Sequence, residues 1–112
     1  MPLKISVAYK LTATAATEAD YTIYTVPGGK RIKLGTFNVT FPIGTDGYLE
    51  ISFYRGLEKI VPTEGVLVGE GMAYGVEEVE EYISGEKIIM HYKNTHPSAA
   101  KYAYILLEGE LL

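Results

Sequence analysis

The chain of 112 residues contains no cysteine and no tryptophan. Without cysteine it can form no disulfide, hold no thiolate nucleophile and build no cysteine-based zinc site. No stretch reaches the roughly 18 to 20 apolar residues that a transmembrane helix needs, so we expect no membrane span. Near the start, Lys4 separates Leu3 from Ile5 where a leader would be uniformly apolar. We therefore expect no signal peptide and synthesis in the cytoplasm, while the final location stays undetermined.

Concentrated positive charge is missing as well. The formal net charge is −4, and the ten Lys and Arg residues are scattered except at Lys30, Arg31 and Lys33. Because nucleic acid is bound through a clustered positive field, we expect no nucleic-acid partner. Glutamine is absent and asparagine occurs only at Asn38 and Asn94. This depletion of thermolabile side chains points toward a thermophilic source.

Strict alternation of apolar and polar residues is what the chain does have, as in residues 3–11 and 48–54. Side chains on an extended strand point to opposite faces in turn, so alternation indicates strands with one buried and one wet face. Glycine- and proline-containing turns separate about eight such strands, which we place at residues 3–11, 20–26, 30–41, 48–54, 57–61, 65–71, 87–93 and 99–112. The buried phase includes Ile5, Val7, Phe37, Val39, Leu49, Ile51 and Phe53.

This spacing of strands and turns predicts an all-β fold, a single antiparallel β-sandwich domain over residues 1–112, with at most one short helix. Residues 76–83 leave two alternatives open. Val76, Val79 and Ile83 recur at helical spacing, with four glutamates on the other face and Gly85 placed as a helix end. An acidic extended connection fits the same residues. The glycine-rich residues 65–71 lack the features of a phosphate-binding loop, and we interpret them as a strand crossing between sheets.

Residues able to carry chemistry are few. We expect His91 to share a strand face with Ile89 and Lys93, and His96 to lie in the following loop. Neither histidine has the spacing of a zinc ligand, and no serine lies in a nucleophile elbow. The glutamates of residues 77–81 are interpreted as a solvated face. We therefore predict no enzyme, no catalytic or metal-binding residue and no cofactor.

Tyrosine is the better clue to function, because the chain contains ten. Tyr48, Tyr54, Tyr102 and Tyr104 fall on the polar phase of their strands. Tyrosine is amphipathic and loses little entropy when it is held in place, so exposed tyrosines suit a contact surface. The alternative is that these rings simply pack. If the rings are exposed, either a sugar lattice or another protein subunit fits them.

Three short segments follow one another in the chain: VPGGK at residues 26–30, ISGEKI at 83–88 and EGELL at 108–112. This order resembles the small jelly-roll-like sandwiches of virion structural proteins, which include capsid decoration and fibre modules. The resemblance implies a jelly-roll-like fold and a non-enzymatic protein that works by repeating contacts, usually as a symmetric oligomer, and that is incorporated into a virion. It assigns no functional residue.

The predicted function is therefore that of a structural or assembly protein, acting through a tyrosine-rich oligomerisation or binding surface. The expected partners are copies of the chain itself or other structural subunits. The alternative function is a carbohydrate-binding module.

Overall fold

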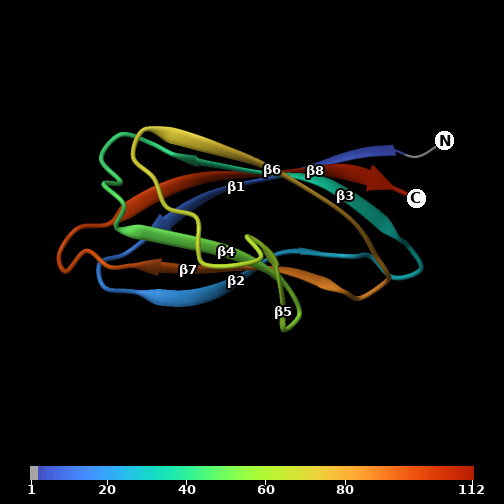
Figure 1. Ribbon diagram of the computed structural model, residues 1–112. Helices are drawn as coiled ribbons and strands as arrows, with labels where there is room; N and C mark the ends of the chain where they lie inside the picture. The colour runs from blue at the N-terminus through green and yellow to red at the C-terminus, as the bar shows by residue number, and fades with distance from the viewer. Residues whose placement is uncertain (1–2) are drawn as a thin grey trace.

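The computed structural model describes residues 3–112, and it contains eight strands in two four-stranded antiparallel sheets (Figure 1). None of the described residues is helical, and in this part of the chain no helix is long and apolar enough to span a membrane. The strands are β1 (Leu3–Ala13), β2 (Glu18–Thr25), β3 (Ile32–Phe41), β4 (Leu49–Arg55), β5 (Glu58–Val61), β6 (Met72–Tyr82), β7 (Lys87–Asn94) and β8 (Lys101–Leu111).

The order of the strands is that of a jelly roll. Sheet A has the order β1-β8-β3-β6, and sheet B has the order β2-β7-β4-β5. The chain resembles one long hairpin that is rolled into two layers, with the strands paired as β1–β8, β2–β7, β3–β6 and β4–β5. The predicted fold class, a jelly-roll-like antiparallel sandwich of about eight strands, is confirmed.

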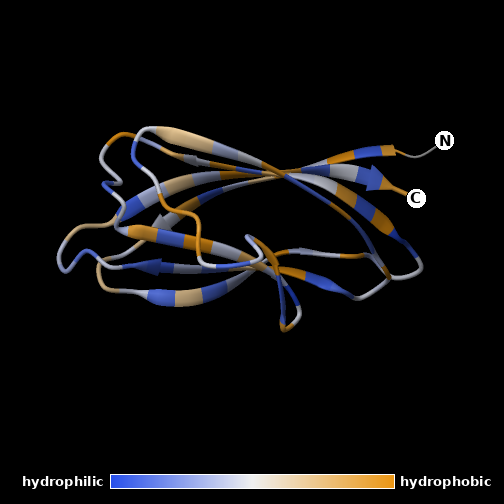
Figure 2. Cartoon of the chain, viewed as in Figure 1, coloured by the Kyte–Doolittle hydropathy of each residue, from blue (hydrophilic) through white to orange (hydrophobic). Residues whose placement is uncertain are grey.

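The core lies between the two sheets, where the inward phases of the strands meet. Phe37 of sheet A and Phe53 of sheet B pack with ring centres 5.2 Å apart, and both are fully buried. Burial decreases toward the beginning of β1, where Leu3 is 66% exposed and Ile5 and Val7 are half-buried. Figure 2 shows hydrophobic and hydrophilic residues alternating along this end of β1.

Residues 76–83 are extended, and the helical alternative is wrong. Residues 72–82 form β6, which pairs with β3 along the edge of sheet A. Tyr74 and Val76 point inward, whereas Val79 lies on the other face and is 61% exposed. The helical spacing of the apolar residues therefore combines two opposite faces of one strand.

The expected strand at residues 65–71 is also wrong, although the segment does connect sheet B with sheet A. Only Leu67 pairs with a strand: its N–H donates to Ile51 at 2.8 Å, and its carbonyl accepts from Ile51 at 3.0 Å. Gly65 and Gly71 have positive φ angles of 74° and 57°, which place bends at both ends of the segment.

The two sheets are also joined by Arg55, at the end of β4. Its guanidinium lies 3.5 Å from the carboxylate of Glu80 and donates to the carbonyl of Glu81 at 3.1 Å, and both residues belong to β6. It also faces the ring of Tyr82. Burial is the main reason why the pKa of Tyr82 is raised to about 12. This contact closes the sandwich at the end of β6.

Candidate functional site

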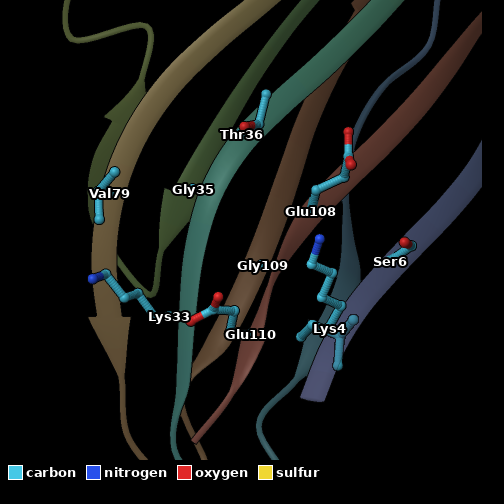
Figure 3. A pocket seen from close by; sticks show the side chains of 10 residues that line it. Lys4, Ser6, Lys33, Gly35, Thr36, Val79, Glu108, Gly109 and Glu110 are labelled. Atoms are coloured by element: carbon cyan, nitrogen blue, oxygen red, sulfur yellow. The ribbon is translucent and has the colours of Figure 1, made fainter. Parts of the chain in front are cut away.

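The outer face of sheet A carries two shallow hollows next to each other along β8. The first has a volume of about 400 Å³ and is lined by residues of all four strands, most of them charged or small: Lys4, Ile5, Ser6, Lys33, Gly35, Thr36, Val79, Glu108, Gly109 and Glu110. Figure 3 shows Lys33, Glu110 and Lys4 following one another across β3, β8 and β1. The register pairs Glu110 with both lysines. Charges of opposite sign therefore alternate across the sheet.

Glycine is required in the floor of this hollow. A Cβ atom on Gly109 would collide with the carbonyl oxygen of Lys33 and would lie 2.9 Å from the Cα of Leu34. At this point the register of β3 shifts against both neighbouring strands, with Gly35 at the shift. The close approach of two backbones thus forms the depression.

The second hollow has a volume of about 440 Å³ and lies beside Tyr104. Its other lining residues are Ala8, Tyr9, Lys10, Asn38, Thr40, Ile105 and Leu106. Asn38 is fixed by two donated hydrogen bonds, to the carbonyl of Leu106 at 3.1 Å and to the carboxylate of Glu108 at 3.0 Å. The hollow therefore combines an aromatic wall with polar groups held in place.

Tyr102 and Tyr104 point outward together from β8, with exposed fractions of 44% and 48%. The ammonium group of Lys10 lies 5.2 Å from the centre of the Tyr102 ring and 5.9 Å from that of Tyr104. These distances are typical of cation–π contacts. Lys10 thus contacts both rings beside the second hollow and gives this part of the surface a positive charge.

Tyr48 lies just before β4, among the loops at one end of the sandwich, and it is 37% exposed. Its ring contacts His96 edge-on with centres 4.6 Å apart, and the ammonium of Lys101 lies 5.3 Å from its centre. His96 accepts from the N–H groups of Ser98 and Ala99 through Nδ1, at 3.1 and 2.9 Å. His96 thus fixes the shape of the loop that follows it, and its ring covers one side of Tyr48.

Tyr54 lies on the outer face of sheet B, in the other layer, and is half-buried beside the ring of His91 at 6.4 Å. The Nδ1 and Nε2 atoms of His91 lie 2.6 Å from Asp20 and 2.8 Å from Glu18. Burial by itself lowers the pKa of His91, but the hydrogen bonds and charges of these two carboxylates leave the pKa raised. Both ring nitrogens are engaged by carboxylates.

The four tyrosines selected from the sequence therefore do not form one surface. Tyr102 and Tyr104 are together on sheet A, Tyr48 is at the adjoining end, and Tyr54 is on sheet B. Sequence reasoning missed Lys10, Glu18 and Asp20. The partners of these residues are more than 70 positions away in the chain, so only the pairing of β1 with β8 and of β2 with β7 reveals them. Within residues 3–112, no group of three His, Asp or Glu side chains is arranged to hold a metal ion.

Comparison with known proteins gives similarity of fold only. No protein-family model matches the chain, and no curated protein matches it either. A chain from the capsid of the Helicobacter pylori bacteriophage KHP30 has a TM-score of 0.56 and 15% identity, with 100% of this chain and 97% of that one covered. A chain of infectious bursal disease virus, Gx strain, has a TM-score of 0.53 and 12% identity, with 99% of this chain and 31% of that one covered.

The chain shares the jelly-roll fold of these virus proteins. The resemblance to jelly-roll virion structural proteins is confirmed at the level of the fold. A chain of the disulfide-linked pili of Bacillus endospore appendages has a TM-score of 0.49 and 17% identity, with 100% of this chain and 92% of that one covered.

Proposed function

We propose that this jelly roll is a non-enzymatic structural subunit that assembles with copies of itself or with other structural subunits. The observation that carries the proposal is the exposed pair Tyr102 and Tyr104, which lie on the outer face of sheet A with Lys10 over both rings. Tyrosine is enriched in protein interfaces because it offers a large contact area at low entropic cost. Tyr48 and Tyr54 extend the proposal to one end of the sandwich and to sheet B.

The setting that we propose is a virion. Its support is the jelly-roll topology shared with a chain of a bacteriophage capsid structure. Immunogold labelling of particles purified from the source organism tests this setting. Labelled particles support it, and particles that carry no label contradict it.

Assembly itself is tested by light scattering after size-exclusion chromatography, over a wide range of protein concentration. We expect a mass above that of the monomer, and a shift toward the monomer in Tyr102→Ala/Tyr104→Ala. The Tyr102→Phe/Tyr104→Phe variant keeps both rings and serves as the control. Tyr48→Ala and Tyr54→Ala, each made alone, test the two remaining tyrosines. A monomer at every concentration overturns the proposal.

Carbohydrate binding is a second candidate function, and the hollow beside Tyr104 favours it. Sugar rings stack on aromatic faces, and Asn38, Thr40 and Lys10 supply hydrogen-bonding groups around the same hollow. A glycan array followed by calorimetry tests this function, with loss of binding expected in Tyr104→Ala but not in Tyr54→Ala. Absence of binding across a broad array contradicts it.

A further inference from the structure

The two edges of sheet A carry opposite charge. Strand β1, at one edge, contains Lys4 and Lys10 and no acidic residue. Strand β6, at the other edge, contains four glutamates and no basic residue: Glu77, Glu78, Glu80 and Glu81. Both strands are 11 residues long. Long edge strands offer unpaired backbone groups to another chain, and proteins normally keep such edges short or protected.

The directions of the strands allow the two edges to meet. Neighbours in the order β1-β8-β3-β6 are all antiparallel, so β1 and β6 run in opposite directions. A second copy placed beside the first in the same orientation brings its β1 antiparallel to the β6 of the first. We propose that copies of this chain join in this way, so that sheet A continues from one copy into the next. This inference rests on the proposed function and names its partner, a second copy of the chain.

The outer face shows which register such a junction takes. Lys4, Glu110, Lys33 and Glu81 form one row across sheet A, as successive strand pairings show. The sign of the charge alternates along this row and ends on Glu81. Placing Lys4 of the next copy beside Glu81 continues the alternation, and opposite charges facing each other across strands are stabilising.

Residues 78 and 79 of β6 lie at the register shift and have no counterpart on β1. The inner face agrees with the same rows when β6 bulges at these two residues in the junction. Val7 and Val76 occupy one row, and Tyr9 and Tyr74 occupy the next. All four side chains are only partly buried in the single chain. At the junction, Val7 of one copy packs beside Val76 of its neighbour, and Tyr9 packs beside Tyr74. Apolar surface left open at both edges is thereby removed from water.

The same charges oppose the pairing of identical edges. Two β1 strands would bring lysines together, and two β6 strands would bring glutamates together, which is destabilising. The junction is therefore heterologous: one edge of each copy binds the other edge of the next. Repetition of one heterologous contact produces a closed ring or an open filament.

Disulfide trapping tests this junction, because the natural chain contains no cysteine. Ser6 and Glu77 share a row at opposite edges of sheet A. Within one copy three strand spacings, about 14 Å, separate them, which is too far for a disulfide. In the junction they face each other. We expect Ser6→Cys/Glu77→Cys to form a ladder of covalent multimers on mild oxidation, and Ser6→Cys/Leu57→Cys, with its second thiol on the exposed turn of sheet B, to form none.

Charge reversal gives an independent readout. Lys4→Glu and Glu81→Lys each place like charges at the junction, so we expect each alone to weaken assembly about tenfold. An equimolar mixture is expected to recover assembly, because the two altered edges complement each other and so do the two natural ones. Lys30→Glu, in a turn away from both edges, is the matched control.

The outcomes separate the two proposals. A wild-type protein that assembles, but gives no ladder and no recovery in the mixture, overturns the β1–β6 junction and leaves the structural function standing. A dimer from Ser6→Cys alone shows that two β1 strands pair, and it also overturns the junction. A wild-type monomer at every concentration overturns both proposals.

Discussion

The guanidinium of Arg55 lies 5.0 Å from the centre of the ring of Tyr82 and so joins the end of β4 in sheet B to the end of β6 in sheet A. Glu58, Glu80 and Glu86 surround the same guanidinium, at 3.4, 3.5 and 3.9 Å. An arginine suits this position because its flat group stacks on a ring while its edge donates several hydrogen bonds.

Replacing this residue by Arg55→Lys is expected to lower the free energy of unfolding by about 1–2 kcal/mol, because lysine cannot stack and donate to Glu81 at once. Urea denaturation measures the change. Arg31→Lys, at an exposed position in a turn, is the control and should change the value by less than about 0.5 kcal/mol. Equal effects of both changes contradict the role of the Arg55 contact.

Substitution of Tyr82, unlike that of Arg55, is expected to cause no loss of stability. Its ring is fully buried, and its hydroxyl has no hydrogen-bond partner among the described residues. A buried hydroxyl without a partner costs about 1–3 kcal/mol, so Tyr82→Phe should leave the protein at least as stable as the wild type. Tyr74→Phe is the matched control, because the Tyr74 hydroxyl donates to the carbonyl of Val68 at 2.6 Å. That variant should lose about 1 kcal/mol. A destabilised Tyr82→Phe shows that the hydroxyl has a partner.

His91 makes stability depend on pH. Its pKa is raised in the folded protein, because the hydrogen bonds and charges of Asp20 and Glu18 outweigh the lowering by burial. A raised pKa stabilises the fold fully below the unfolded value of about 6.5, and this contribution is lost as the pH rises through the folded value. His91→Gln should therefore destabilise the protein more at about pH 5.5 than at about pH 8.5.

Denaturation at the two pH values measures this difference, and an NMR titration follows the ring of His91 directly. In Asp20→Asn/Glu18→Gln the titration should move to lower pH. If His91 in the wild type titrates at or below the pH of a free histidine, the ion pairs do not form in solution.

Gly109 is expected to tolerate no side chain. The Gly109→Ala variant places a methyl group against the backbone of Lys33 and Leu34, so β3 and β8 must separate. Such overpacking costs about 1–3 kcal/mol. Gly28→Ala is the control, because no atom lies within 4 Å of the added carbon and its φ angle is not positive. Thermal unfolding of both variants checks the prediction, which fails if the two melt together.

Alternation of apolar and polar residues was sufficient to find most strands. Residues 48–54 predict β4 to within one residue, since Leu49, Ile51 and Phe53 all point into the core. At residues 76–83 the sequence leaves a helix and an extended segment open, because Glu80 occupies the inward phase of β6. There Arg55, which comes from the other sheet, neutralises the carboxylate. A charge at an inward position hides the period of two, and the sequence gives no sign of the distant arginine that permits it.

The candidate site was predictable only in part. The outward phase of Tyr102 and Tyr104 follows from their alternation with Ile105 and Leu107. The position of Lys10 over both rings depends on the pairing of β1 with β8, and no local pattern encodes that pairing.

The position of β8 in the middle of sheet A has a consequence for the order of folding. Strand β8 is the last of the eight in the chain, yet it lies between β1 and β3. During synthesis, β1 and β3 wait without a partner strand between them until β8 has left the ribosome. Pairing over such a sequence separation is slow. Sheet A, with its basic and acidic edges in place, is thus completed last, so a nascent chain does not offer both edges to its neighbours before its own fold is finished.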